Sequence, residues 1–273
     1  MKIDFPNSLQ SNLNSKFKAK IDLNIQVGRF FIKTISSVDE LKLAFQLRFQ
    51  VFQVEMIGHE NKIGEDQDEF DLISDHLAVF DTKTQQMVAT CRLNSSLFSN
   101  HFYSAQEFSC QELIQRPEVK LEIGRVCVHQ EFRKGVIIML LWRAIADYMM
   151  KSGAKILFGC GSVLTENANE ALLVYRYIQE QGKVRNHLNI HPTDSYRSAE
   201  FELLLSKNSQ KLTEVELEQA RLLLPALCRS YFDIGCYSAG VPAYDREFKC
   251  YDFLTILESD ELDPRVRQKM MGS

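Results

Sequence analysis

A carboxylate and a guanidinium stand in an otherwise apolar, β-rich run, LEIGRVCVH, at residues 121–129. In a regular strand successive side chains alternate between faces, so Glu122 and Arg125 should point opposite ways. Gly124 between them could mark a β-bulge, which would re-aim one side chain and leave a backbone N–H unpaired. Such an N–H could stabilise the oxyanion of an attacked carbonyl. Spacing alone favours the opposing interpretation, in which both charges lie at a solvated strand edge or pair with neighbours.

An arginine and an acidic loop lie upstream of this run. The helical pattern that begins near Asp39 places Arg48, Phe52 and Glu55 on about one face. A guanidinium on an apolar face needs a carboxylate partner. The loop at residues 64–75 offers Asp66, Asp68, Glu69 and Asp71. Crowded carboxylates beside arginines also suit a substrate amine, which must lose a proton before it attacks. A solvated acidic loop is the commoner structure for such a run.

The turn QEFRKGV precedes a long apolar helical pattern. The first N–H groups of that helix, together with Gly135 and the charges of Arg133 and Lys134, could hold a phosphate. Arg and Gly before a helix are as often an ordinary cap.

Other catalytic motifs are missing from the sequence. No G-x-S-x-G, P-loop or G-x-G-x-x-G occurs, so nothing supports serine or cysteine nucleophilic catalysis, and Cys127 and Cys160 are best interpreted as core thiols. His187 and His191 are four apart, but no third ligand accompanies them before Pro192, and we expect no metal site.

Composition limits the class of protein. A chain of 273 residues, 45% apolar, can bury a large core, and a net charge of -4 leaves no basic surplus for a nucleic-acid partner. Seven cysteines, odd in number and never in a C-x-x-C pair, favour reduced thiols in the cytoplasm. The N-terminus lacks the apolar core of a signal peptide, and the longest apolar run is too short to span a bilayer. We expect a cytoplasmic protein, attached at most to a membrane surface.

Strand and helix patterns alternate along the chain and predict an α/β (α+β) fold with a mixed central sheet flanked by helices. The expected order is strand RFFIKTI, helix SSVDELKLAFQLRFQVFQVEM, hairpin HLAVFD and MVATCRLN, strand VKLEIGRVCVH, helix RKGVIIMLLWRAIADYMMKSG, strand KILFGCGS, helix NEALLVYRYIQEQG, helical TEVELEQARLLLPALCRSYFDIG and strand FKCYDFLTILE. Pro225 should kink or split the last helical pattern.

Taken in order, several of these motifs resemble the bacterial ornithine-acyl-carrier-protein N-acyltransferases, hemolysin-like members of the GNAT superfamily. They are Arg48-x-x-x-Phe52, DQDEFDLISDHL, ATCRL, LEIGRVCVH, FRKGVIIMLLWRAIADYM and GVPAYDREFKCYDFLTIL. More distantly, the charged set is similar to that of the acyl-homoserine-lactone synthases. The resemblance spans residues 29–267 and implies one GNAT-like domain there, with a helical insertion around 187–230. An N-terminal arm at 1–28 and a tail at 268–273 would flank it.

The resemblance implies that a 3-hydroxyacyl chain arrives as a phosphopantetheine thioester on acyl carrier protein. The α-amine of ornithine would attack the thioester and give lyso-ornithine lipid. No bound cofactor is expected, since the acyl-phosphopantetheine is a co-substrate. The implied roles are catalytic for Glu122, Asp71 and Arg125, substrate-binding for Arg48, Phe52, Asp68 and Arg92, and phosphopantetheine-binding for Val126, Val128, Arg133 and Gly135.

One departure bears on the donor. The superfamily turn usually reads R/Q-x-x-G-x-G/A, whereas this chain has RKGVII with a single glycine. The shortened turn suits one phosphodiester better than the pyrophosphate of coenzyme A, which favours acyl carrier protein. Because carrier proteins are acidic, candidates for their docking face are Arg133, Lys134, Arg143 and Lys151.

Two other functions compete with this prediction. One is synthesis of an acyl-homoserine lactone or of another N-acyl amino acid. The other is a non-catalytic protein that binds acyl carrier protein or lipid, which we would expect to have lost the Glu122/Arg125 and Asp68/Asp71 pairs; both pairs are present. An amphipathic product would also favour peripheral contact with the inner face of the cytoplasmic membrane.

Overall fold

The computed structural model describes residues 17–58, 64–133, 135–207 and 210–261. Contacts within the chain define two compact units, Met1–Ser99 with Ile123–Gly153 (unit 1) and Asn100–Glu122 with Ala154–Ser273 (unit 2). Strand β6 (Lys120–Val128) begins in unit 2 and continues in unit 1.

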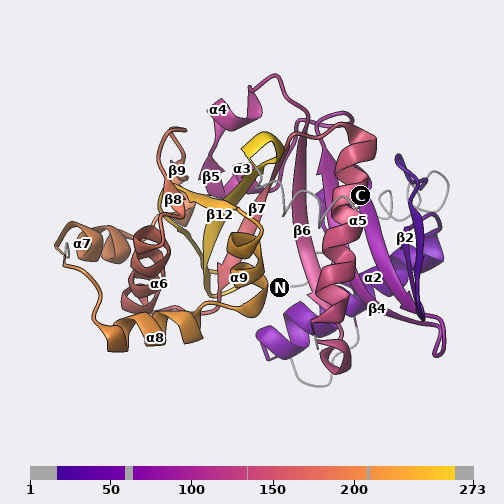
Figure 1. The fold of residues 1–273 in the computed structure, drawn as a ribbon, viewed down its shortest axis with the longest axis horizontal. Helices are drawn as coiled ribbons and strands as arrows, with labels where there is room; N and C mark the ends of the chain where they lie inside the picture. The colour runs from indigo at the N-terminus through magenta and orange to yellow at the C-terminus, as the bar shows by residue number, and fades with distance from the viewer. Residues whose placement is uncertain (1–16, 59–63, 134, 208–209, 262–273) are drawn as a thin grey trace. The chain divides into compact units, whose positions relative to one another are not determined.

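Unit 1 is a sheet with a helix on each face (Figure 1). Its strands follow the order β1 (Asn24–Val27), β2 (Phe30–Thr34), β3 (Asp75–Asp81), β4 (Gln86–Ser95) and β6, and β1 to β4 pair antiparallel. Its helical segments are α2 (Val38–Phe49), the π-helix η1 (Gln50–Met56), the 3-10 helices η2 (Glu69–Leu72) and η3 (Gln130–Phe132), and α5 (Val136–Ser152).

The two faces of the unit 1 sheet follow from strand alternation. On β3, Ala78 packs with Phe45 of α2 in one hydrophobic cluster. Asp75, three residues earlier, accepts a hydrogen bond from Tyr148 of α5 at 2.8 Å. Side chains an odd number of positions apart point to opposite faces, so α2 and α5 cover opposite faces of the sheet. Helix α5 ends at Gly153, whose left-handed backbone (φ +67°) forms its C-cap.

Unit 2 combines strands with a group of helices. Residues 120–122 of β6 pair parallel with β7 (Ile156–Val163), which pairs antiparallel with β12 (Cys250–Glu258). The other strands are β10 (Tyr237–Ala239) and β11 (Ala243–Asp245) on β12, β8 (Val184–Arg185) on β10, and β5 (Phe108–Ser109) with β9 (His191–Pro192). The helices are α3 (Ser104–Glu107), α4 (Gln111–Ile114), α6 (Ala168–Glu180), η4 (Asp194–Tyr196), α7 (Ala199–Lys207), α8 (Glu214–Leu223), α9 (Ala226–Asp233) and η5 (Ser259–Glu261).

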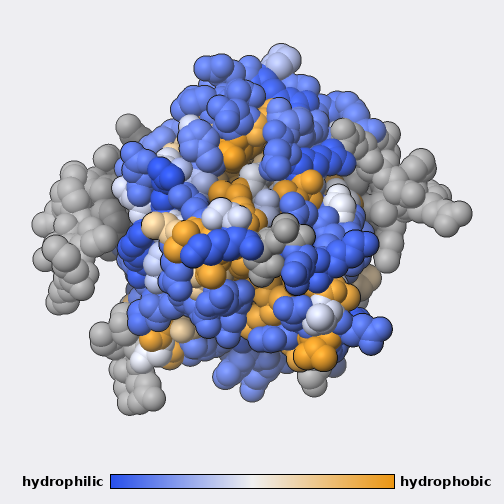
Figure 2. All heavy atoms as spheres, turned by 90° about the vertical axis from the view of Figure 1, so that its left-hand side faces the viewer, coloured by the Kyte–Doolittle hydropathy of each residue, from blue (hydrophilic) through white to orange (hydrophobic). Residues whose placement is uncertain are grey.

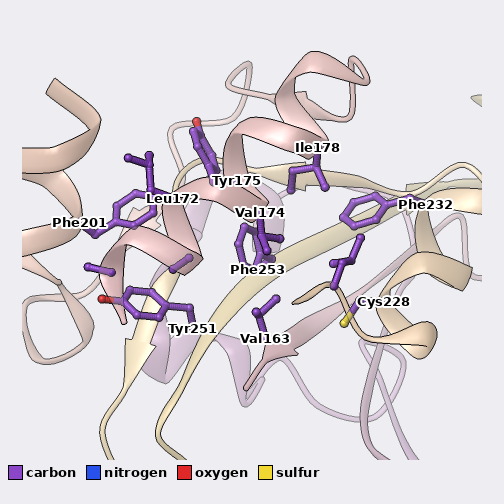
Figure 3. Packing of buried hydrophobic residues seen from close by; sticks show 13 residues of the cluster. Val163, Leu172, Val174, Tyr175, Ile178, Phe201, Cys228, Phe232, Tyr251 and Phe253 are labelled. Carbon is purple, nitrogen blue, oxygen red and sulfur yellow. The ribbon is translucent and has the colours of Figure 1, made fainter. Parts of the chain in front are cut away.

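Helix α6 forms the centre of a hydrophobic core in unit 2. Leu172, Tyr175 and Ile178 recur on it at three-residue spacing and are buried, as an amphipathic helix requires. Figure 3 shows this helix beside β12, with Val174 near Phe253. Burial of large side chains stabilises by about 1.5–3 kcal/mol each, so this core fixes α6 on its strands.

The expected mixed sheet with flanking helices is confirmed, and so is the split at Pro225, which separates α8 from α9. Two local expectations differ. Residues 24–27, expected within an arm, form β1, and the single helix expected at 36–56 changes from α2 into a π-helix at Gln50. Helices α7 to α9 lie largely in the range expected as an insertion. The domain boundaries stay a prediction, and residues 1–16 of the arm, the tail and residue 134 lie outside the described residues.

The surface and the cysteines of the described residues bear on membrane contact and on disulfide formation. Among the residues that the structure describes, we find no helix with the length and hydrophobicity that a bilayer crossing requires. Figure 2 shows a mostly hydrophilic face on which hydrophobic residues gather in separate patches. All seven cysteines carry unpaired thiols, and all but Cys160 are buried, as core thiols would be.

Candidate active site

Three arginines and three aspartates of unit 1 form one ion-pair network. Its arginines come from three elements, with one at the end of α2, one on β4 and one on β6. Its aspartates come from the loop before η2 and from η2 itself. The members are Arg48, Arg92, Arg125, Asp66, Asp68 and Asp71.

The buried half of the network centres on Arg48, whose side chain is 1% exposed. Its Nη1 donates to Asp71 Oδ1 at 2.7 Å and its Nε donates to Asp66 Oδ1 at 2.8 Å. Arg92 Nη1 donates to the same Asp71 oxygen at 3.0 Å. A guanidinium in the core is tolerated because its fork of donors meets carboxylates.

Local sequence explains why the aspartates are in place. In DEFD, Asp68 accepts from the N–H of Phe70 at 2.9 Å, and Asp71 Oδ2 accepts from the N–H of Asp68 at 2.8 Å. This capping box starts η2 and orients both carboxylates through backbone hydrogen bonds within the loop.

The environment of Asp71 bears on its predicted catalytic role. Burial favours a higher pKa for Asp71, but Arg48 and Arg92 outweigh it and hold that pKa well below the usual range. A carboxylate of such low basicity accepts a proton poorly near neutral pH. Asp71 is therefore the anion that pairs with both arginines at the centre of the network. Its role as a catalytic base stays a prediction.

The network also has a buried histidine. His76 lies against Asp71, with its Nε2 placed 3.1 Å from the Asp71 carbonyl oxygen. Burial lowers the pKa of His76 to about 4, although Asp71 acts in the opposite direction. The imidazole is therefore neutral at pH 7.

A pH dependence of stability follows from His76. Because its folded pKa is depressed, the unfolded chain takes up a proton first as pH falls. The stabilising contribution is complete above about pH 6.5 and is lost progressively toward pH 4, at a cost of about 3 kcal/mol. Unfolding curves between pH 7 and pH 4 should show a smaller loss for His76→Gln than for wild type. Equal losses in both proteins would contradict this.

The exposed edge of the network is the pair Asp68 and Arg125, whose side chains are 21% and 15% exposed. Arg125 Nη2 donates to Asp68 Oδ2 at 3.0 Å, and its guanidinium lies 6.0 Å from the ring centre of Phe52 on η1. Arg92 also donates to Asp68. The structure thus brings together all the predicted substrate-binding residues and Arg125 at one place in unit 1.

Arg125 has an unusual backbone. Its φ of +50° lies in the left-handed region, which costs a residue with a Cβ about 1–2 kcal/mol. Non-glycine residues held this way cluster at functional sites. The irregularity of β6 was expected at Gly124, and the positive φ lies one residue later, at Arg125. That a backbone N–H near Gly124 stabilises an oxyanion stays a prediction.

The residues predicted to bind phosphopantetheine lie on β6, at the end of η3 and at the start of α5. Gly135 has φ +88° and is the N-cap of α5. Arg133 donates from Nε to the Val128 carbonyl at 2.9 Å and forms an ion pair with Glu55. Val126 on β6 is partly buried. To bind the phosphate of phosphopantetheine, Arg133 would have to give up its ion pair with Glu55.

Glu122 lies in unit 2, where its carboxylate accepts two backbone hydrogen bonds. The N–H groups of Tyr103 and Ser104 donate to it at 2.9 and 2.7 Å, and the side chain is buried. Glu122 therefore caps the start of α3, the role an acidic group plays at a helix N-terminus. Its role as general base stays a prediction.

Unit 2 also contains a carboxylate cluster that the sequence analysis missed. Oxygens of Glu107, Asp245 and Asp252 lie within 4.8 Å of one another, and all three residues are buried. Asp245 is the aspartate of GVPAYD, so that motif was the available signal. Burial, then Asp252 and Asp245, raise the pKa of Glu107 well above its usual range. Glu107 thus holds a proton where a free glutamate would not.

Glu107→Gln should remove a pH dependence of stability. Because the folded pKa of Glu107 is raised, its contribution is complete below the unfolded value near 4.5 and is lost as pH rises toward the folded value. The variant should therefore match wild type near pH 5 and be more stable at pH 8, when measured by chemical unfolding. A variant that is less stable than wild type at pH 8 would contradict a raised pKa for Glu107.

Comparison with known proteins shows which proteins the chain is similar to. Residues 47–143 match the model of the acetyltransferase (GNAT) domain, a range that includes every member of the ion-pair network. This stretch of the chain is therefore similar to a GNAT acetyltransferase domain. The chain is 29% identical over 243 residues to an L-ornithine N(alpha)-acyltransferase of Rhizobium meliloti (strain 1021), covering 84% of this chain and 80% of the relative.

Further relatives extend this comparison. An L-ornithine N(alpha)-acyltransferase of Brucella abortus (strain 2308) is 26% identical, with 88% of each chain covered. Among solved structures, an N-acyl amino acid synthase from uncultured soil microbes aligns with a TM-score of 0.47 at 8% identity, covering 86% of this chain and 94% of that chain. The similarity to the L-ornithine N(alpha)-acyltransferases confirms the resemblance stated from the sequence.

Proposed function

We propose that this protein is an N-acyltransferase that moves a 3-hydroxyacyl chain from a thioester to the α-amine of L-ornithine. The carrying observation is the ion-pair network of unit 1, whose exposed edge offers a guanidinium and a carboxylate side by side. An amino acid presents the opposite charges, a carboxylate and an ammonium. The names of the relatives, L-ornithine N(alpha)-acyltransferase, support the acceptor and the nitrogen that is acylated.

In this reaction the neutral amine attacks the thioester carbonyl carbon. The C–S bond breaks, the thiol leaves, and the amine gives up a proton as the amide forms. Arg125 is well placed to hold the α-carboxylate because its planar fork can bind both oxygens. The ring of Phe52 lies 6.0 Å from that guanidinium, at the limit of a cation–π contact.

We propose that the acyl donor is a thioester on acyl carrier protein. Its phosphopantetheine would meet Val126 and Val128 of β6 and the N-terminus of α5 at Gly135, where unpaired N–H groups favour a phosphate. The single glycine of RKGVII supports one phosphodiester over a pyrophosphate. Arg143 and Lys151 lie exposed on α5 and would suit an acidic partner. An amphipathic product also supports peripheral contact with the inner face of the cytoplasmic membrane.

The donor proposal is tested with matched thioesters. Purified protein is incubated with L-ornithine and either 3-hydroxyacyl carrier protein or the same acyl chain on coenzyme A, and the amide is quantified by mass spectrometry. We expect amide from the carrier protein at a rate at least tenfold above that from coenzyme A. Equal rates would refute the carrier-protein preference. Absence of amide from both donors, with acyl carrier protein still bound, would indicate a binding protein instead.

A further inference from the structure

The carboxylate oxygens of the ion-pair network differ in how many hydrogen bonds they accept. Asp71 Oδ1 accepts from Arg48 and Arg92, and its Oδ2 accepts from the backbone of Asp68. Asp68 Oδ1 accepts from Arg92 and from a backbone N–H, and its Oδ2 accepts from Arg125. A ligand that bound to either carboxylate would have to displace or share these hydrogen bonds.

Asp66 is the exception. Arg48 reaches its Oδ1 through both Nε and Nη2, at 2.8 and 2.7 Å, and Arg125 Nε lies 3.4 Å from the same oxygen. Within the described ranges 17–58, 64–133, 135–207 and 210–261, Asp66 Oδ2 has no hydrogen-bond partner. The side chain is only 8% exposed. This oxygen is not among the fully buried unpartnered polar atoms of the described residues, so it is the part of the carboxylate that a ligand can reach from solvent.

The position of this oxygen identifies the ligand's chemistry. It belongs to an anion, so it favours a cationic donor, and its carboxylate is the immediate neighbour of the Arg125 guanidinium. A guanidinium and a carboxylate in contact match the two charged groups on the α-carbon of an amino acid, which are also neighbours. The side-chain ammonium of ornithine is several bonds away from the α-carboxylate.

We propose that Asp66 Oδ2 accepts a hydrogen bond from the α-ammonium of the amino-acid acceptor while Arg125 binds its α-carboxylate. This inference rests on the proposed function and adds a substrate-contacting residue to it. Asp66 selects for an α-amino acid and holds the nitrogen that is later acylated. Arg48 keeps Asp66 in place through the other oxygen, so the ligand-facing oxygen needs no rearrangement.

The test compares Asp66→Asn with wild type on three ligands by calorimetric titration without donor. L-Ornithine has both ammonium groups, L-norvaline lacks the side-chain ammonium, and 5-aminovalerate lacks the α-ammonium. The variant should bind ornithine and norvaline about tenfold or more weakly, because a charge-assisted hydrogen bond is lost, and should bind 5-aminovalerate as wild type does. In turnover, KM for ornithine should rise while KM for the acyl donor stays the same.

Controls separate this role from a structural one. Asp39→Asn removes the same charge from an exposed position on α2 and should leave all three affinities unchanged. Unfolding midpoints check that Asp66→Asn is folded, and Asp66→Glu, which keeps the charge beside Arg48 and Arg125, provides the same ligand comparison if the amide variant does not fold.

Each other pattern overturns the proposal. Weaker binding of ornithine and 5-aminovalerate, with norvaline unchanged, would place the side-chain ammonium at Asp66. Equal weakening of all three ligands would show that Asp66 acts only through the network, and no change would remove it from the site. If wild-type protein forms no amide at all, the proposed function fails, whereas an active wild type without the expected pattern refutes this inference alone.

Discussion

Arg48→Met is expected to lower the free energy of unfolding by about 3 kcal/mol, because Asp71 keeps only Arg92 and Asp66 keeps only Arg125 as a neighbouring guanidinium. Methionine fills most of the volume, so the loss reports the missing ion pairs rather than a cavity. Chemical unfolding at pH 7 measures the effect. Lys42→Met, at an exposed position on the same helix, is the matched control and should change stability by less than about 0.5 kcal/mol.

The pH dependence of this loss in the free energy of unfolding shows whether charge causes it. As pH falls, protonation of Asp71 removes the charge that has lost its Arg48 partner, so the difference between Arg48→Met and wild type should shrink. A loss below about 1 kcal/mol at pH 7, or one that does not depend on pH, would contradict the view that this ion-pair network holds α2 to the loop before η2.

Glu122→Gln is expected to lower turnover by about 10²-fold or more if Glu122 accepts the amine proton directly or through water. The structure adds a second effect. The carboxylate accepts N–H groups from Tyr103 and Ser104, and an amide can offer only one oxygen to them. We therefore also expect a loss of about 1–2 kcal/mol in the free energy of unfolding.

The catalytic and structural effects are separated by measuring turnover and the free energy of unfolding in the same variants. Glu200→Gln, on the exposed surface of α7, is the control and should alter neither. If Glu122→Gln loses stability but keeps its turnover, then Glu122 serves only to hold the start of α3. If it loses turnover at nearly full stability, the catalytic role gains support.

Local patterns were sufficient to predict much of this fold. The helix α5 could be predicted because an apolar run lies between two glycines, Gly135 and Gly153, that adopt positive φ at its ends. The hairpin of β3 and β4 follows from two strand-forming segments that flank a short polar turn. Each of these signals lies within a few residues of the element it specifies, so no knowledge of distant contacts is needed.

Other features of the fold and of the site depend on contacts between residues far apart in the sequence, which local spacing does not encode. The π-helix η1 contains ordinary helix-forming residues, and only packing determines that Ile57 donates to Phe52 rather than one position later. The left-handed backbone of Arg125 is likewise held by the aspartates it reaches, 57 positions away in the case of Asp68. For the same reason the sequence could suggest that arginines and aspartates pair, but it could not show which oxygen would be left without a partner.

The central claim is acylation of the α-amine of ornithine, and it is tested most directly by the identity of the product. Purified protein is given 3-hydroxyacyl carrier protein and an equimolar mixture of amino acids, and the amides are identified by mass spectrometry, with fragmentation to locate the acylated nitrogen. The account predicts one dominant product, ornithine acylated at the α-nitrogen. Acylation of a different amino acid, or of the side-chain nitrogen of ornithine, would contradict it.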